Sequence, residues 1–435
     1  MARIIIASTP ARGHLTPLRS IAGDLVRRGH EVVVTSASVF RESVEATGAR
    51  FVPLGGAADF DADAEQKEHD EKDPVPPGPA KLAPDLQWLI NDPVPAQHAT
   101  LQALLAESEE PTALVVENGF FGTWPTLTGA PGRRPEAVVV VGISPVTALS
   151  VDTAPFGFGL PPDASPQGRE RNAVLNAQVR AGLSEVSAGL QRAVDEAGGG
   201  EAPFIFDGQL TLADRFLQLA PASVEYPRSD APDVLRYIGP LPAGPVHDVA
   251  LPAWWSDVEE AEHVVVVTQG TAANGDLTAL VQTTFDALAD REDLLVVAAT
   301  GRDDADELTP PPNARVGGFI PFELLLPRAE LLVTNGGYGG SLQALSHGVP
   351  LVLAGDTEDK IEGTARLAWS GAGVNLATGH PTVEAVREAV GTVLSDPRFA
   401  QGARRVQAEI AAHHPYDEIE DAVLELLARS ETTAP

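Results

Sequence analysis

Four glycines gather where an apolar run gives way to a helical pattern, at Gly336, Gly337, Gly339 and Gly340. Glycine leaves backbone N–H groups uncovered, and the first turn of a helix has N–H groups without partners in the helix. Such a turn can hold a diphosphate through amide donors and the positive end of the helix dipole, with no cation strictly required. The sequence GGYGG does not match the dinucleotide fingerprint GxGxxG, and a plain tight turn is the alternative.

Two other polar turns follow apolar runs in the same half of the chain. Residues 356–360, DTEDK, follow the run at 351–353. Their carboxylates could bond sugar hydroxyls, although acidic residues also favour the first turn of any helix. Residues 268–271, TQGT, follow the run at 264–268 and could add a hydroxyl and amides to the same phosphate. Both turns therefore support a ligand that combines phosphate and sugar.

A histidine follows the first apolar run of the chain, in the stretch Arg12-Gly13-His14-Leu15. An imidazole between a strand and a helix would point into a ligand crevice and titrate near neutrality, so it can act as a general base. A helix-capping or surface histidine is the alternative. A neutral imidazole needs its second nitrogen oriented, usually by a carboxylate. The candidates are Glu117 and Asn118, directly after the run at 113–116.

Five aromatic residues gather in expected loops of the first half of the chain, namely Phe120, Phe121, Trp124, Phe156 and Phe158. They could line an apolar pocket for a second ligand. Membership of the hydrophobic core is the alternative, and we expect it for about half of them.

The elements that would position these residues alternate regularly. An apolar run at 4–7, a Thr-Pro cap, an amphipathic stretch and a second strand at 31–35 form a parallel βαβ unit with a right-handed crossover. Further buried-type strands at 113–116 and 137–141 extend this first sheet. The alternation begins again in the second half, with strands expected at 264–268, 294–298, 331–334 and 351–353. Two doubly wound parallel sheets follow.

We expect four segments along the chain. A first Rossmann-like domain covers residues 1–235, and a proline- and glycine-rich stretch at 236–253 is the candidate linker. A second Rossmann-like domain covers 254–400, and helices at 401–435 could pack back toward the first domain. Two such lobes place a ligand site in the crevice between them, at the carboxyl ends of both sets of strands.

Composition narrows the possible partners. The 435 residues include 61 acidic and 30 basic ones, and the net charge of −31 disfavours contact with nucleic acid and anionic membranes. The chain has no cysteine, which excludes disulfides and thiolate metal sites and fits a reducing compartment. The first apolar run is too short for a signal peptide, and no stretch approaches the ~18 apolar residues of a membrane span. We expect a cytoplasmic protein.

Together these motifs resemble the GT-B glycosyltransferases of the UDP-glycosyltransferase-like family, especially bacterial enzymes that glycosylate macrolides and other natural products. The resemblance covers most of the chain. It lies in Gly13-His14 with Pro17, in YIGP at 237–240, in TQGT at 268–271 and, most specifically, in residues 334–373. It implies an α/β GT-B fold of two Rossmann-like doubly wound parallel-sheet domains that face each other across a cleft. The first would bind the acceptor and the second the nucleotide sugar.

The resemblance also implies an inverting transfer from a UDP- or dTDP-sugar to a hydroxyl of a hydrophobic small molecule, with no metal and no cofactor besides that co-substrate. His14 falls on the catalytic base, and the five aromatic residues would contact the acceptor. Residues 319–322 match the nucleobase segment, the glycine turn with Thr271 would receive the diphosphate, and the pair at 359–360 would contact the sugar. The implied donor-binding residues are Thr271, Phe319, Ile320, Asn335, Gly336, Gly337, Gly339, Gly340, Ser341, Asp359 and Lys360.

Three positions depart from the family pattern. Asn335 stands in place of a diphosphate-binding histidine, Lys360 replaces a glutamine, and Asn118 falls where the base-orienting aspartate is expected. Glu117 is the substitute, but we expect it to be misdirected because adjacent strand residues face opposite ways. The departures at Asn335 and Asn118 favour an alternative, a non-catalytic sugar-nucleotide-binding auxiliary protein of a glycosyltransferase system. A monomer and a homodimer are both compatible with the sequence.

Overall fold

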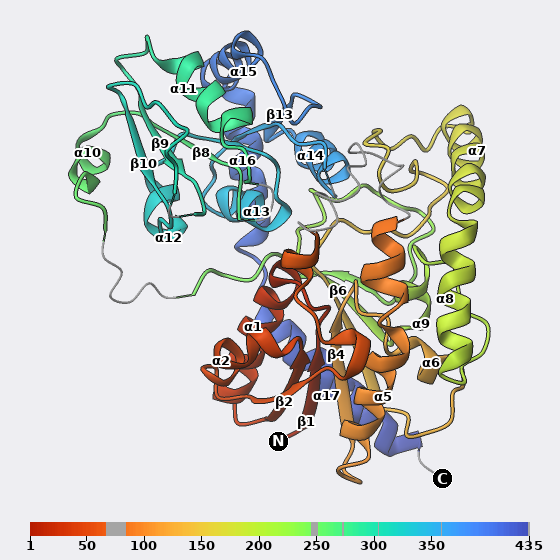
Figure 1. The fold of residues 1–435 in the computed structure, drawn as a ribbon. Helices are drawn as coiled ribbons and strands as arrows, with labels where there is room; N and C mark the ends of the chain where they lie inside the picture. Colours follow the sequence, from red (N-terminus) through yellow and green to blue (C-terminus); the bar gives the residue numbers. More distant parts are fainter. Residues whose placement is uncertain (67–83, 245–250, 272–273, 303, 358, 434–435) are drawn as a thin grey trace.

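The computed structural model describes residues 1–66, 84–244, 251–271, 274–302, 304–357 and 359–433. Two parallel β-sheets, each with helices on both faces, form two lobes (Figure 1). The first sheet has the order β3-β2-β1-β4-β5-β6-β7, and the second has the order β10-β9-β8-β11-β12-β13. The expected pair of Rossmann-like sheets is therefore confirmed.

The first sheet consists of β1 (Arg3–Ala7), β2 (Glu31–Ser36), β3 (Arg50–Pro53), β4 (Thr112–Glu117), β5 (Ala137–Gly142), β6 (Arg215–Gln218) and β7 (Leu235–Tyr237). The second consists of β8 (Val264–Thr268), β9 (Leu295–Ala299), β10 (Ala314–Gly317), β11 (Leu331–Thr334), β12 (Leu351–Leu353) and β13 (Gly373–Asn375). Central strands such as β1 and β8 are runs of valine and isoleucine with every residue buried, as expected for parallel strands covered on both faces.

The helices of the first lobe are α1 (Arg12–Arg27), α2 (Arg41–Glu45), α5 (Val94–Leu105), α6 (Trp124–Leu127), α7 (Pro166–Gly182), α8 (Ser184–Glu196) and α9 (Gly208–Leu212). Those that follow are α10 (Trp255–Glu260), α11 (Thr283–Leu288), α12 (Phe322–Leu325), α13 (Tyr338–Ser346), α14 (Lys360–Trp369), α15 (Val383–Ser395), α16 (Pro397–Ile410) and α17 (Pro415–Thr433). Among the described residues, none of these helices is both long and apolar enough to cross a bilayer.

The strand order of each sheet changes direction at one point, between β1 and β4 in the first and between β8 and β11 in the second. Ligands of doubly wound sheets bind at such switch points, beyond the carboxyl ends of the strands. The ends of these four strands and the segments that follow them carry His14, Glu117, the turn at 268–271 and the glycine turn. The topology thus brings the chemically suggestive motifs to the two switch points.

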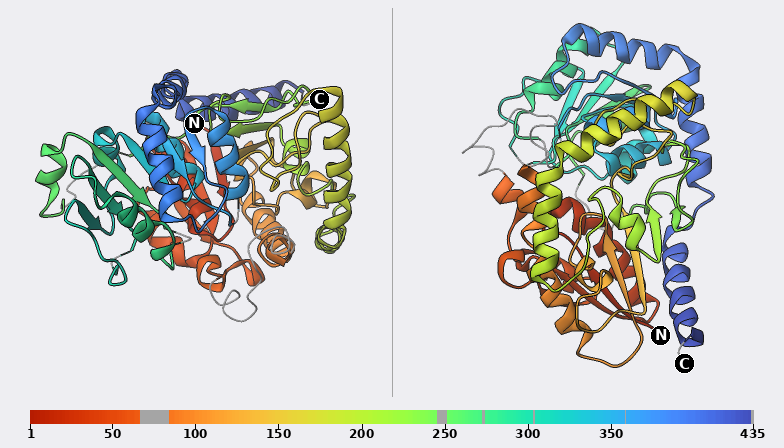
Figure 2. Two further views of the ribbon diagram at one scale, coloured as in Figure 1. Left: turned by 90° about the horizontal axis from the view of Figure 1, so that it is seen from above. Right: turned by 90° about the vertical axis from the view of Figure 1, so that its right-hand side faces the viewer.

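The structure moves the boundaries expected from the sequence. The linker expected at 236–253 begins inside β7, which pairs with β6 of the first sheet, and its residues 245–250 lie outside the described part of the chain. The boundary expected at residue 400 falls inside α16, which buries Ala403 and Val406 in the second lobe. The next helix, α17, crosses over and packs against β4, β5 and α1 of the first lobe, as the right-hand view of Figure 2 shows.

Candidate active site

His14 lies in the first turn of α1, three residues after an extended N-cap at Ala11. Its Nδ1 is 3.0 Å from Oε2 of Glu117, at the carboxyl end of β4. The histidine side chain is 31% exposed, whereas that of Glu117 is completely buried. One nitrogen of the ring is therefore held from inside the fold, and the ring itself remains open to solvent.

The Glu117 carboxylate accepts several further hydrogen bonds. Its Oε1 accepts from the backbone N–H of Thr9 at 3.0 Å and from the Thr9 hydroxyl at 2.6 Å. Its Oε2 also accepts from the N–H of Gly119. Thr9 follows β1, the neighbouring strand, so the two strand ends fix this carboxylate together. Buried charges are tolerated when they are bonded in this way.

Asn118 takes a different direction. Its side chain accepts a hydrogen bond from the N–H of Ile143 at 2.9 Å and donates to the Ser144 hydroxyl, also at 2.9 Å. The expectation that Glu117 would be misdirected is therefore wrong. Glu117 is the last residue of β4 and faces the end of β1, while Asn118 lies beyond the strand and faces the segment after β5.

Gly119 is a site residue that sequence reasoning missed. A Cβ atom at this position would lie 2.9 Å from Cε1 of His14 and 3.0 Å from Oε2 of Glu117. Real Cβ contacts are essentially never shorter than 3 Å, so any side chain here would push the pair apart. A glycine directly after the two candidate orienting residues was the available signal. Thr9 also belongs to the site, but nothing in the sequence next to it indicated this role.

The charges around His14 favour its protonated form. Burial acts to lower the pKa of His14, but the charge and hydrogen bond of Glu117 raise it above the ordinary value of 6.5, with smaller contributions from Asp359 and Asp63. Burial likewise acts to raise the pKa of Glu117, yet His14 and the two bonds from Thr9 keep it below 4.5. Asp359 belongs to the second lobe, so charges of both lobes act on the pKa of the histidine.

The glycine turn follows β11. Gly336 has a positive φ of 83°, which favours glycine, and Gly337 is the N-cap of α13. The first bond of the helix runs from the N–H of Ser341 to the carbonyl of Gly337 at 3.0 Å. The N–H groups of residues 338–340 therefore have no acceptor within the helix. A Cβ atom on Gly339 would meet nothing within 4 Å, so this part of the turn faces open space.

Other polar groups of this turn are already engaged. The N–H of Gly336 donates to the Thr334 hydroxyl at 3.2 Å, and that of Gly337 donates to the Asn335 side chain at 3.4 Å. Asn335 in turn donates to the carbonyl of Gln269, which ties the glycine turn to the turn at 268–271. Ser341 is fully buried and its hydroxyl has no hydrogen-bond partner in the described structure. Ser341 was expected to bind the nucleotide sugar, but its side chain is closed to solvent in this structure.

The remaining donor residues differ in exposure. Thr271 is exposed, and Phe319 is 68% exposed, so its ring can stack on a ligand. The side chain of Ile320 is buried in the second core, which leaves only its backbone for a nucleobase. Asp359 is the half-buried N-cap of α14, and Lys360 is buried with Nζ 3.2 Å from the Thr357 hydroxyl.

Three of the five aromatic residues expected to bind an acceptor belong to the core instead. Phe120 and Trp124 are 0% exposed and Phe121 is 4% exposed, so all three side chains are buried. Phe120 packs in one hydrophobic cluster of the first lobe, and Phe121 and Trp124 pack in another. Phe156 is half-buried against Phe206, and Phe158 is 37% exposed. The loop that carries these last two is the aromatic surface near the seam between the lobes.

Two relatives that match along almost their whole length decide the family. The chain is 41% identical over 436 residues to UDP-glycosyltransferase 2 of Phaeomoniella chlamydospora, covering 98% of this chain and 96% of that one. It is 39% identical over 430 residues to 4'-demethylrebeccamycin synthase of Lentzea aerocolonigenes, covering 97% and 98%. The chain belongs to the UDP-glycosyltransferase-like family. The expected family and enzyme class are confirmed.

Residues 282–426 of this glycosyltransferase match the family described as "Erythromycin biosynthesis protein CIII-like, C-terminal domain". The crystal structure of the calicheamicin glycosyltransferase CalG4 superposes with a TM-score of 0.72 at 20% identity, covering 100% of both chains. At this identity the likeness shows the fold, and it confirms the expected GT-B arrangement of the glycosyltransferase.

Proposed function

We propose that this glycosyltransferase moves a sugar, with inversion and without a metal, from a UDP- or dTDP-sugar to a hydroxyl of a hydrophobic natural product. The observation that carries the proposal is the bonded pair of His14 and Glu117, with Asp359 of the second lobe acting on the same histidine. A solvent-accessible imidazole held by a buried carboxylate is the arrangement that general-base catalysis needs.

The proposed reaction uses both switch points. Because Nδ1 of His14 is bonded to Glu117, Nε2 removes the proton of the acceptor hydroxyl, and Glu117 stabilises the imidazolium. The acceptor oxygen forms a bond to the anomeric carbon while the bond from that carbon to the diphosphate breaks on the opposite face. The diphosphate leaves with the bonding electron pair toward the N–H groups of residues 338–340. Amides and the helix dipole would offset its negative charge.

The relatives support the substrate classes. The relative from Phaeomoniella chlamydospora is named as a UDP-glycosyltransferase, and the relative from Lentzea aerocolonigenes is named for a rebeccamycin. Phe319 offers an exposed ring for a nucleobase, and Phe156 and Phe158 offer an apolar surface for an acceptor. A nucleotide sugar and an apolar aglycone fit these surfaces.

The test is direct. Purified protein is incubated with UDP- and dTDP-sugars and with phenolic or polyketide acceptors, and glycosides are sought by mass spectrometry, with the anomeric configuration read by NMR. We expect a glycoside of inverted configuration that forms equally well in the presence of a chelator. His14→Ala should lower kcat by about 10²-fold or more. Undiminished turnover of that variant would remove the mechanism.

A non-catalytic auxiliary role is the second candidate. Asn335, in place of the family histidine, favours it because its amide is already bound to the carbonyl of Gln269. Binding of UDP measured by calorimetry, together with no glycoside across a broad acceptor panel, would establish that role and overturn the enzymatic one.

A further inference from the structure

A buried network of charged residues joins the two lobes. The second lobe contributes Glu362 and Arg366 of α14 and Tyr338 of α13, and the first contributes Glu225 from the segment after β6. The side chains of Arg366, Glu225 and Glu362 are 1%, 0% and 2% exposed. Charges buried this deeply persist only when they are paired and hydrogen-bonded.

Arg366 lies at the centre of this network. Its Nε and Nη2 donate to Oε1 of Glu362 at 2.9 and 2.8 Å, and its Nη1 donates to Glu225. Nη2 also donates to the carbonyl of Val146 at 2.8 Å. Tyr338 adds a hydrogen bond from its hydroxyl to Glu225 at 2.7 Å. One face of the Glu362 carboxylate is thus committed to the guanidinium group.

The other oxygen of Glu362 binds the loop at 155–159, which has the sequence PFGFG. Oε2 accepts from the N–H of Gly157 at 3.2 Å and from the N–H of Gly159 at 3.1 Å. These glycines directly follow Phe156 and Phe158. Gly159 has a φ of +59°, and a Cβ atom there would lie 3.0 Å from the carbonyl oxygen of Ile361. The loop therefore lies on the backbone of α14.

The same helix contacts the glycine turn on another side. A Cβ atom on Gly336 would lie 2.2 Å from Cγ2 of Thr364, so the turn packs directly on α14. The N-cap of α14 is Asp359, the residue that acts on His14. One short helix therefore supports the proposed donor turn and, through Glu362, the aromatic loop of the other lobe.

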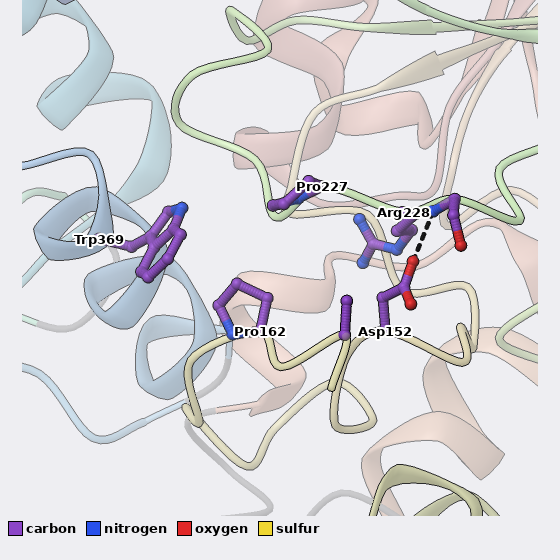
Figure 3. A pocket seen from close by; sticks show the side chains of 7 residues that line it. Asp152, Pro162, Pro227, Arg228 and Trp369 are labelled. Carbon is purple, nitrogen blue, oxygen red and sulfur yellow. Dashed lines mark hydrogen bonds between the residues drawn. The ribbon is translucent and has the colours of Figure 1, made fainter. Parts of the chain in front are cut away.

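The seam also contains a gap between apolar side chains near the end of α14. A pocket of about 380 Å³ lies where Trp369, near the end of α14, faces Pro162 and Pro227 of the first lobe (Figure 3). Arg228 lines this pocket, and its Nη1 is 3.8 Å from Glu225. The gap lies beside residues that follow the loop, whereas the loop itself packs on Ile361 and is bonded to α14 through the carboxylate of Glu362.

We propose that Glu362 is a positioning residue for the transfer reaction, whose carboxylate fixes the 155–159 loop on α14 and so assembles the acceptor surface against the donor turn. This inference rests on the proposed function. The position requires a carboxylate because it lies between two sets of donors, the Arg366 guanidinium and the two glycine amides. A glutamine would turn its NH₂ group toward one of these sets and lose its hydrogen bonds.

Two variants test the inference from opposite sides. Glu362→Gln replaces one of the two hydrogen-bond-accepting oxygens with an NH₂ group. Gly159→Ala leaves the ion network intact but moves the loop away from α14, because of the strained φ and the contact with Ile361. We expect both to raise the acceptor KM about tenfold or more. The Kd for UDP, measured by calorimetry, should change by less than about twofold, because neither residue touches the glycine turn.

Glu420→Gln is the matched control, since Glu420 is a partly buried carboxylate bonded to Arg28 and His30, away from the loop. It should leave the acceptor KM unchanged. An unchanged acceptor KM in both test variants would overturn the inference, and so would a parallel rise of the acceptor KM and the Kd for UDP, which indicates a merely structural role. If Glu362→Gln does not fold, Gly159→Ala decides alone. If the wild-type protein forms no glycoside, the proposed function fails as well.

Discussion

The carboxylate of Glu117 is buried, yet all of its hydrogen-bonding capacity is directed to three neighbours. His14, Thr9 and Gly119 donate to it, and their positions follow from the adjacent ends of β1 and β4. A carboxylate held this firmly selects the tautomer of the histidine ring and stabilises its positive charge. The catalytic strength of the proposed base therefore depends on a residue that never meets solvent.

The first prediction concerns Glu117→Gln. A general base must be neutral, so activity rises as the pH rises through the pKa of His14, which lies above 6.5 in the wild-type protein. Removal of the negative charge lowers this pKa, so the acidic limb of the profile of kcat/KM against pH should move to lower pH. The plateau should fall about 10²-fold. A limb that stays in place would show that another group sets the profile.

The pair of His14 and Glu117 also makes the stability of the fold depend on pH. The folded-state pKa of His14 is raised, so its contribution is complete below pH 6.5 and is lost as the pH rises through the raised value. The folded-state pKa of Glu117 is depressed, so its contribution is present above pH 4.5 and is lost as the pH falls through the lowered value.

The second prediction concerns Gly119→Ala. The added methyl group would lie 2.9 Å from the ring of His14, so the pair must separate and kcat should fall about tenfold or more, with the Kd for UDP unchanged. Steady-state kinetics and calorimetry measure the two quantities. Gly391→Ala is the control, because a Cβ atom there meets nothing within 4 Å. Equal kinetics of both variants would contradict the assigned geometry.

The sequence identified His14 and both candidate partners but could not choose between Glu117 and Asn118. The choice depends on where β4 ends relative to β1, because Glu117, the last paired residue of β4, reaches Thr9 after β1, whereas Asn118 lies beyond the strand. That register is a property of the pairing between segments about a hundred residues apart. No local pattern encodes it.

At the scale of elements, the first turn of α13 offers N–H groups toward open space, and this can be tested without disturbing the fold. Gly339→Asp places a negative charge at a helix N-terminus, which the helix dipole favours, so the melting temperature should not fall. The same charge repels a diphosphate, and the Kd for UDP should rise about tenfold or more. Gly339→Ala should bind UDP nearly as the wild type does. Equal binding by the Asp variant would place the diphosphate elsewhere.

The central strands were predictable and the outer ones were not. The strands β1, β4, β5 and β8 are continuous apolar runs because both of their faces are covered. The missed strands lie at or beside the sheet edges, and their runs are short and mixed, as in RFVP, RFLQ, LRY, ARVG and GVN. The prediction that the aromatic residues near α6 contact an acceptor was wrong for a related reason. Whether a loop residue is buried depends on which other segments pack over the loop.

At the scale of the whole molecule, α17 packs in the first lobe, although the strand it contacts most, β5, ends at Gly142 and α17 begins only at Pro415. Ile419 and Val423 are fully buried in the first hydrophobic core. We expect Ile419→Ala to lower the free energy of unfolding by about 2–5 kcal/mol, because it leaves a cavity between α17 and the first sheet. Leu424→Ala on the same helix should cost far less, since Leu424 is 40% exposed. Denaturant titration compares them, and equal losses would mean that α17 does not pack as described.

The return of the chain to its first lobe has a consequence for recombination between homologues. In a chimera joined only near residue 244, the first sheet would pack against the α17 helix of the other homologue. The native contacts of Ile419 would then be replaced. Two breakpoints are needed, the second between α16 and α17, so that each lobe keeps every segment it was built with. The contact of Glu362 depends less on side-chain identity in the first lobe, because its partners across the seam are the backbone amides of Gly157 and Gly159.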